Sequence, residues 1–279
     1  MIPALLKLMR LYYSLPLAGG FVVILYYLTG DNISPVIDKT IPAALSLFFI
    51  ISGGYVLNDI FDIDIDRINC PGRMLPSGKV TLKTALLFSI ILFILGLICA
   101  GFGGIPFLTG IIIVTGLLTF YDLYSKRMGI FKDILVAILM TLLYPLAFAL
   151  AEPVRTPRLN VLFIHPFWLF ITCLGYEMLK DIRDVKGDIN KYGNSVKNFG
   201  RKRWFLVISR ILAVTAALVN LLPFFLGYCR LIYLMASVGA IILAIASTFN
   251  KPVTAIRYIY AEVFLITAGS MADLMVFGP

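Results

Sequence analysis

The chain has 279 residues, of which 60% are hydrophobic and only 14% are charged, whereas an ordinary soluble domain has about 25% charged residues. This composition excludes an ordinary soluble globular protein and predicts an integral membrane protein. The chain carries 24 Lys and Arg residues against 15 Asp and Glu residues, but its basic loops are short and lie between apolar segments. Nucleic-acid binding needs an exposed basic face with stacking aromatic residues, so we expect no nucleic-acid partner.

Apolar segments recur along the whole chain, and a bilayer-spanning helix needs about 17–25 mostly apolar residues. Because the segments continue to the end, we do not expect a cleavable signal ahead of a soluble domain. Pro16, Pro145 and Pro166 fall inside predicted spans and indicate kinks, which membrane helices tolerate. No linker divides the chain, so we predict an all-α polytopic membrane protein with one domain over residues 1–279. The nine predicted spans are 11–30, 41–57, 84–102, 105–122, 132–151, 161–179, 205–226, 231–248 and 257–277.

Lys and Arg residues are distributed unequally between the two sides of the predicted membrane domain. Most of the 24 lie at the N-terminus and in the loops 58–83, 123–131, 180–204 and 249–257, which all fall on one side. Because basic loops stay in the cytoplasm, we expect this side to be cytoplasmic in a protein of the cell membrane.

Acidic residues gather in two short segments, each directly after a predicted span. The first is "NDIFDIDID" at 58–66 and the second is "KDIRDVKGD" at 180–188; we call them the first and second acid motifs. In both, three aspartates have the relative positions 0, 3 and 7, which lie within about 60° of one another on an α-helix. Each motif therefore predicts a one-sided row of carboxylates: Asp59, Asp62 and Asp66 in the first, and Asp181, Asp184 and Asp188 in the second.

Asp64 does not belong to the row, because two residues past Asp62 it points about 200° away on a helix. We expect solvent or an adjacent Arg as its partner.

Carboxylates stacked at these spacings repel one another, so a cation should offset them. Oxygen ligands without His or Cys favour Mg²⁺, which is often shared between carboxylates and substrate phosphates. The alternative is a solvated helix end with no ligand. Basic residues interleave with the motifs and suggest a polyphosphate clamp, although membrane orientation alone would also place such residues there. They include Arg67, Arg73, Lys126, Arg127, Lys180, Arg183 and Lys186.

A site that binds a diphosphate at the membrane surface beside apolar helices indicates an amphiphilic substrate with an anionic head and an apolar tail, such as an isoprenyl diphosphate. Residues 58–66 resemble the N-D-x-x-D-x-x-x-D signature of the UbiA-type intramembrane prenyltransferase superfamily, and residues 180–188 resemble its second aspartate motif. "DRINCPGRMLPSG" at 66–78 is similar to the segment that follows the first signature, and "YDLYSKR" at 121–127 is similar to the Tyr and Lys loop of the family. The resemblance covers essentially the whole chain.

This resemblance implies nine helices around a central cavity, with the acid motifs facing one another across its cytoplasmic mouth. It implies Mg²⁺ as cofactor and no protein nucleophile: the allylic C–O bond ionises and a bound acceptor attacks the carbocation. The implied metal and diphosphate residues are Asn58, Asp59, Asp62, Asp66, Asp181, Asp184 and Asp188. Arg67, Arg73, Lys126 and Lys180 are the expected diphosphate contacts, and Tyr121 and Lys126 form the expected catalytic pair.

The acceptor pocket of the family lies near the first span, where Arg10 and Tyr13 are the expected acceptor residues. The form of the motifs favours geranylgeranylglyceryl phosphate as acceptor, and hence ether lipid synthesis, over an aromatic acceptor of the quinone or chlorophyll-tail type. Met74 and Asp133 depart from the common family pattern. A cation-coupled transporter is the alternative from another class, but transporters place such groups near the midplane of the membrane.

Four further polar residues lie within or near the ends of predicted spans, where ionisable groups are costly and often functional. Glu177 stands one turn before Asp181 and extends the second row. For Glu262 and Asp273 we favour pairing between helices or an interfacial position over catalysis, and we interpret His165 as a packing or interfacial residue.

Overall fold

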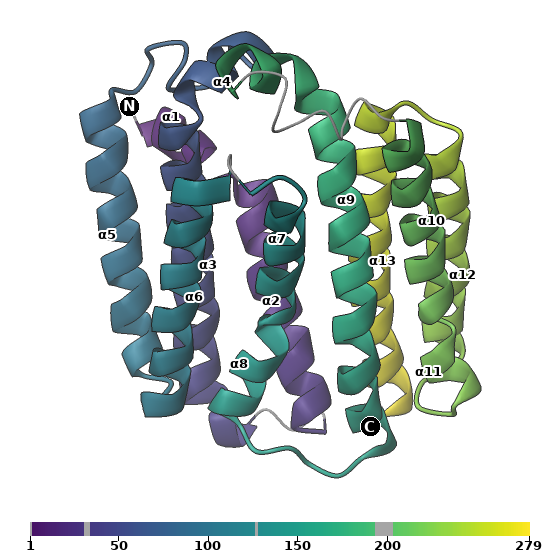
Figure 1. Cartoon of the computed structure of the whole chain (residues 1–279). Coiled ribbons are helices and arrows are strands. Elements are labelled where there is room, and N and C mark those ends of the chain that lie inside the picture. Colours follow the sequence, from purple (N-terminus) through teal and green to yellow (C-terminus); the bar gives the residue numbers. More distant parts are fainter. Residues whose placement is uncertain (1, 31–33, 126–127, 193–202) are drawn as a thin grey trace. The chain divides into compact units, whose positions relative to one another are not determined.

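The computed structural model describes residues 2–30, 34–125, 128–192 and 203–279, with the backbone alone at Pro35 and 185–192. Within these ranges the chain forms helices and no strands (Figure 1). The helices are α1 (Ile2–Leu8), α2 (Leu11–Leu28), α3 (Ile37–Phe61), α4 (Ile63–Asn69), α5 (Leu82–Gly101), α6 (Ile105–Tyr124), α7 (Phe131–Thr141), α8 (Leu143–Leu150), α9 (Val161–Tyr192), α10 (Arg203–Val219), α11 (Leu222–Phe225), α12 (Leu231–Thr248) and α13 (Pro252–Phe277).

Nine helical stretches in this part of the chain are long and apolar enough to span a membrane. They match the nine predicted spans to within a few residues, except that the sixth extends to Asp184, and they confirm an all-α integral membrane protein. Pro16 and Pro166 lie inside the continuous helices α2 and α9, as predicted. Before Pro145 the helix is interrupted at a single residue, since α7 ends at Thr141 and α8 begins at Leu143; Leu142 keeps helical angles (φ −64°, ψ −13°) and residues 131–150 still form one span, which agrees with a kink and not a break. The proline ring clashes with the carbonyl four residues before it, which is that of Thr141.

The described chain divides into two compact units, and each is described by itself. The first unit comprises Met1–Val22, Val36–Lys132 and Asp184–Lys197, and the second comprises Val23–Pro35, Asp133–Arg183 and Asn198–Pro279.

In the first unit, α3 packs against α5 and α6 (Figure 1). The approach of α3 to α5 depends on a glycine, because a Cβ atom on Gly96 would lie 2.6 Å from Cδ1 of Ile50. Small residues allow membrane helices to approach this closely. Ser89 on α5 also donates a hydrogen bond of 2.9 Å to the carbonyl of Gly53 on α3. The end of α3 that carries the first acid motif is therefore held against its neighbours.

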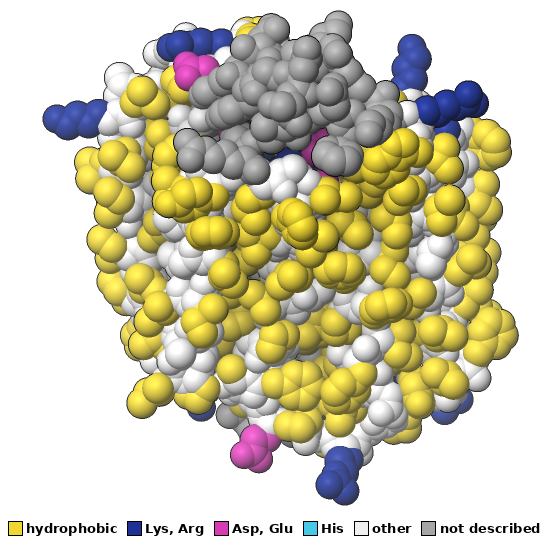
Figure 2. All heavy atoms as spheres, in the orientation of Figure 1, with side chains coloured by type: hydrophobic (Ala, Val, Ile, Leu, Met, Phe, Trp, Pro, Cys, Tyr) yellow, Lys and Arg dark blue, Asp and Glu magenta, His cyan; other side chains and the backbone are white. Residues whose placement is uncertain are grey.

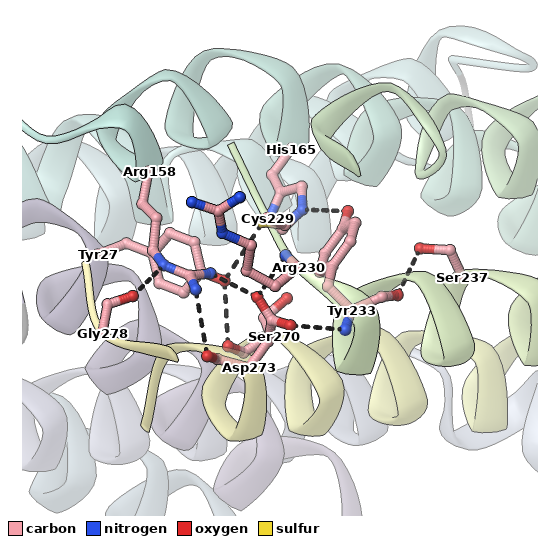
Figure 3. A network of polar contacts seen from close by, with 10 residues as sticks. All are labelled: Tyr27, Arg158, His165, Cys229, Arg230, Tyr233, Ser237, Ser270, Asp273 and Gly278. Carbon is pink, nitrogen blue, oxygen red and sulfur yellow. Dashed lines mark hydrogen bonds and ion pairs between the residues drawn. The ribbon is translucent and has the colours of Figure 1, made fainter. Parts of the chain in front are cut away.

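In the second unit, α12 packs against α13, and a Cβ atom on Gly269 of α13 would overlap Cβ of Ala236 of α12. A buried network ties these helices together (Figure 3). The carboxylate of Asp273 accepts a hydrogen bond of 2.7 Å from Arg158 and bonds of 2.8 and 3.0 Å from the backbone N–H groups of Arg230 and Tyr233. Because Arg230 is the N-cap of α12, Asp273 caps this helix from a neighbouring one.

The same network explains His165, whose Nε2 atom lies 2.9 Å from the Tyr233 hydroxyl (Figure 3). His165 is thus a packing residue with a polar partner, and Asp273 pairs between helices, in agreement with the sequence interpretation. Glu262 is also buried, and its Oε1 atom accepts a hydrogen bond of 3.4 Å from the Trp168 indole.

Hydrophobic side chains are spread across the middle of the face visible in Figure 2. Large apolar residues such as Ile98, Phe163 and Ile242 are exposed. For a soluble protein such exposure would cause association, whereas in a bilayer these side chains meet lipid.

Candidate functional site

The first acid motif lies at the junction of two helices. Asn58 and Asp59 are in the last turn of α3, Asp62 lies between the helices, and Asp66 is in α4. We expected one continuous helix, and this was wrong, because Asp62 has φ −92° and ψ 3°. The backbone bonds from Asp62 N–H to the Asn58 carbonyl and from Asp66 N–H to the Asp62 carbonyl nevertheless persist. The row of carboxylates bends at its centre without being dispersed.

Two carboxylates of this motif are buried and face the same arginine. Asp59 is 4% exposed and Asp66 is 5% exposed. The Nη1 atom of Arg73 lies 2.5 Å from Asp66 Oδ2 and 3.5 Å from Asp59 Oδ1. A buried charge is tolerated when it is paired and hydrogen-bonded. Arg73, an expected diphosphate contact, therefore lies directly beside the proposed metal ligands.

The loop 70–81 that carries Arg73 is folded by its own backbone. Arg73 donates its N–H to the Cys70 carbonyl, and its own carbonyl accepts from Ser77. Leu75 and Val80 anchor the loop in a hydrophobic core with Val56 of α3 and residues of α1 and α5. The burial of Leu75 and Val80 thus fixes the loop and, with it, the position of Arg73.

Arg10 reaches the same site from the N-terminal helices. It lies between α1 and α2 with φ 48°, a region that non-glycine residues seldom adopt. Its guanidinium forms an ion pair with Asp59 and lies 5.0 Å from the ring centroid of Tyr55. The ring of Tyr13 lies 5.7 Å from that of Tyr55. The two residues expected to bind the acceptor therefore lie beside the first acid motif.

Asp64 lies on the exposed side of α4, where its Oδ1 atom is 3.2 Å from Nη1 of the exposed Arg67. This confirms an adjacent arginine as its partner. Arg67 points with Asp64 toward solvent, whereas Asp59 and Asp66 are buried.

Asp122 is a polar residue of this site that the sequence reasoning missed. It is 5% exposed on α6, and its Oδ1 atom accepts a hydrogen bond of 3.0 Å from Nδ2 of Asn58. An ionisable residue at the end of an apolar span is a functional signal, and this signal was present in the sequence next to Tyr121. Tyr121 is half-buried in α6, whereas Lys126 lies outside the described residues.

The second acid motif lies in α9. Asp184 belongs to the first unit, where its carbonyl accepts a hydrogen bond of 3.0 Å from Nδ2 of Asn69 at the end of α4. Asp181 belongs to the second unit and is half-buried. The helical position of Asp188 is described, but its side chain lies outside the described residues.

Lys180, in the second unit, is held by a neighbour one turn away. Its Nζ atom donates to both carboxylate oxygens of Glu177, at 2.8 and 2.9 Å, and lies 5.6 Å from the ring centroid of Tyr176. Glu177 is buried, so the pairing with Lys180 also compensates its charge. The structure thus gives Glu177 a lysine partner.

The ligand chemistry of the first motif suits a hard cation, since it combines carboxylate and amide oxygens without His or Cys. The described residues contain no group of three or more His, Cys, Asp or Glu side chains arranged to hold a metal ion. Arg10 and Arg73 instead offset Asp59 and Asp66. Burial raises the pKa of Asp66, and the charges of Asp59 and Asp62 add to this, while Arg73 opposes it.

Comparison with known proteins identifies the family of this chain. The model of the UbiA prenyltransferase family matches residues 16–253. Digeranylgeranylglyceryl phosphate synthase of Sulfurisphaera tokodaii is 33% identical to this chain over 222 residues, which cover 76% of each protein.

Solved structures share the fold. A structure described as digeranylgeranylglyceryl phosphate synthase in membranes is similar with a TM-score of 0.69, at 23% identity over 98% of both chains. A UbiA homologue from Archaeoglobus fulgidus bound to GPP and Mg²⁺ also has a TM-score of 0.69, at 17% identity over 98% of this chain and 100% of that one. From the match over most of its length and the relative at 33% identity, this chain belongs to the UbiA prenyltransferase family.

Proposed function

We propose that this prenyltransferase transfers an isoprenyl group from a prenyl diphosphate to geranylgeranylglyceryl phosphate, with Mg²⁺ as cofactor. The observation that carries the proposal is the pair of buried carboxylates, Asp59 and Asp66, that share Arg73 at the end of α3. The relative from Sulfurisphaera tokodaii is named as a synthase of digeranylgeranylglyceryl phosphate. The similar protein from Archaeoglobus fulgidus was solved with GPP and Mg²⁺, which supports the same substrate and metal classes here.

The metal ligands in this proposal are the hard oxygens of the two acid motifs. When bound, Mg²⁺ offsets the negative charge that accumulates on the leaving diphosphate. The residues that would hold it are Asn58, Asp59, Asp62, Asp66, Asp181, Asp184 and Asp188.

Basic side chains bind the diphosphate and stabilise its charge in the transition state. Arg73 has the strongest structural support, because it already lies beside Asp59 and Asp66. Glu177 supports Lys180 in this role, since it orients the lysine ammonium from a buried position. Arg67 is included among the proposed diphosphate contacts because it directly follows the first acid motif. In the structure it forms a solvent-exposed ion pair with Asp64. Tyr121 and Lys126 complete the catalytic set by the family register.

The acceptor is proposed to bind near Arg10 and Tyr13. A guanidinium suits a phosphate-bearing acceptor, and Arg10 lies beside Asp59. In this proposal the acceptor phosphate binds close to the diphosphate, and apolar walls exclude water from the carbocation. An aromatic acceptor remains the alternative outcome of the test below.

Two features of organisation belong to the same proposal. The family match over residues 16–253 runs through both compact units, which supports one catalytic domain over residues 1–279. The excess of Lys and Arg on the side of the acid motifs supports a cytoplasmic position for them.

The test is a transfer assay with purified protein in detergent. Geranylgeranylglyceryl phosphate is compared with a panel of aromatic acids and quinone precursors, each with a prenyl diphosphate and Mg²⁺, and products are identified by mass. We expect a prenylated glycerophospholipid, release of diphosphate, and loss of both with EDTA. A prenylated aromatic product would overturn the proposed acceptor, and turnover in EDTA would overturn the metal. Cation flux in vesicles without any transfer product would favour a transporter.

A further inference from the structure

We infer that Asp122 is a positioning residue that sets which end of the Asn58 side-chain amide faces the metal. The inference rests on the proposed function, since it assigns a further role at the same site. It begins from one contact within the first unit: Nδ2 of Asn58 on α3 donates a hydrogen bond of 3.0 Å to Oδ1 of Asp122 on α6. Asp122 is buried and stands outside both acid motifs.

A side-chain amide has two chemically different ends of nearly the same shape. Its oxygen accepts hydrogen bonds and binds hard cations, whereas its NH₂ group only donates and repels a cation. An ionised carboxylate only accepts hydrogen bonds. When Asp122 takes the NH₂ group of Asn58, the amide oxygen must therefore face away from Asp122. The contact removes the orientation in which Asn58 would present a donor to the metal.

The choice of an aspartate at position 122 is costly. Burying a charge is unfavourable unless the charge is hydrogen-bonded, and residue 122 is only 5% exposed near the end of an apolar helix. A neutral amide at this position would avoid that cost, but it would accept either end of Asn58 equally well. The carboxylate is the side chain that makes the orientation unique. Groups that orient a metal ligand in this way commonly contribute a factor of about 10–100 in metal affinity.

The experiment measures metal binding without turnover. Purified protein in detergent is titrated with Mg²⁺ at a fixed concentration of inorganic diphosphate, and the shift of the thermal unfolding midpoint reports the apparent Mg²⁺ affinity. Four variants are compared with the wild type: Asp122→Leu, Asn58→Ala, the double variant, and Asp64→Asn as a matched control. Asp64→Asn removes one carboxylate charge from the same unit, but from an exposed residue of α4.

We expect Asp122→Leu to weaken the apparent Mg²⁺ affinity by about 10–100-fold and Asp64→Asn to leave it within about twofold. Because Asp122 acts through Asn58, the double variant should bind Mg²⁺ as weakly as Asn58→Ala does. If Asp122→Leu fails to fold, the isosteric Asp122→Asn is used in its place, with a smaller loss expected because an amide at 122 bonds to either end of Asn58.

Three results have distinct meanings. An unchanged affinity in the Asp122 variant would overturn the inference. Losses that multiply in the double variant would show that Asp122 acts independently of Asn58, and would overturn it as well. Absence of any Mg²⁺-dependent shift in the wild type would instead contradict the metal dependence of the proposed function, so the two failures are distinguishable.

Discussion

Arg10 places its guanidinium on Asp59, a residue 49 positions further along the chain. The pairing joins the junction of α1 and α2 to the first acid motif, and it occurs although the Arg10 backbone has φ 48°. A non-glycine residue in this region costs about 1–2 kcal/mol. The fold accepts this strain where an ion pair compensates a buried carboxylate.

The Arg10–Asp59 pair predicts different effects for two substitutions. Arg10→Ala should lower the free energy of unfolding by about 1.5–3 kcal/mol, because Asp59 loses a charged hydrogen-bond partner. Arg10→Gly loses the same contact but relieves the backbone strain, so it should unfold at a higher temperature than Arg10→Ala. Thermal unfolding in detergent measures both, with the exposed Lys7→Ala as control. If Arg10→Ala matches Lys7→Ala, the pair does not stabilise the fold.

Neighbouring aspartates of the first acid motif should differ sharply in transfer activity. Asp62→Ala should lower kcat by orders of magnitude, because Asp62 lies at the centre of the carboxylate row. Asp64→Ala should stay within about threefold, since exposed ion pairs contribute only about 0–1 kcal/mol and Asp64 pairs with the exposed Arg67. Steady-state rates at saturating substrates compare the two. Equal losses would show that the position of an aspartate in the carboxylate row does not decide its role here.

Acidification should weaken Mg²⁺ binding at a higher pH than it would if all the ligands were aspartates with the usual pKa. A metal ligand must be deprotonated, and burial raises the pKa of Asp66 above the usual value of about 3.9 for an aspartate. As the pH falls, Asp66 therefore takes up its proton at a higher pH than an exposed carboxylate does. As the pH is lowered, the apparent Mg²⁺ affinity of the wild type in the presence of diphosphate should begin to fall at a pH above the usual titration range of an aspartate.

The variants isolate this effect from the titration of diphosphate itself. Asp66→Asn should bind Mg²⁺ more weakly at neutral pH and with a shallower pH dependence, while Asp64→Asn should follow the wild type. If the plot of apparent Mg²⁺ affinity against pH has the same shape for Asp66→Asn as for the wild type, the pH dependence belongs to another group.

The Arg158–Asp273 pair in the second unit should matter for stability (Figure 3). Asp273→Ala leaves Arg158 buried without its carboxylate, and breaking a buried pair costs about 3–5 kcal/mol. Replacing both residues with Leu should recover part of that loss, because no unpaired charge remains. Thermal unfolding measures this, with the exposed Glu152→Ala as control. A double variant less stable than Asp273→Ala would contradict this account.

The sequence alone determined the features that depend on the composition and spacing of residues within one segment. Transfer of an apolar segment into lipid depends on its own length and composition, so the nine spans were predictable. The spacing of the two acid motifs predicted a site for phosphate and metal. The break at Asp62 escaped prediction, because a change of backbone angle at one residue leaves no trace in hydrophobicity, whereas the proline at position 145 indicated the interruption before it.

The tertiary structure decided which distant polar groups meet. Asn58 and Asp122 are 64 positions apart, and Arg158 and Asp273 are 115 positions apart. Such contacts depend on which helices pack together and at what rotation, and close packing at small residues such as Gly96 sets both within a unit. No spacing rule within one segment specifies a partner on another helix. The sequence thus determined which ligand types the two acid motifs offer, and helix packing determined how Arg10, Arg73 and Asp122 are held around the first motif.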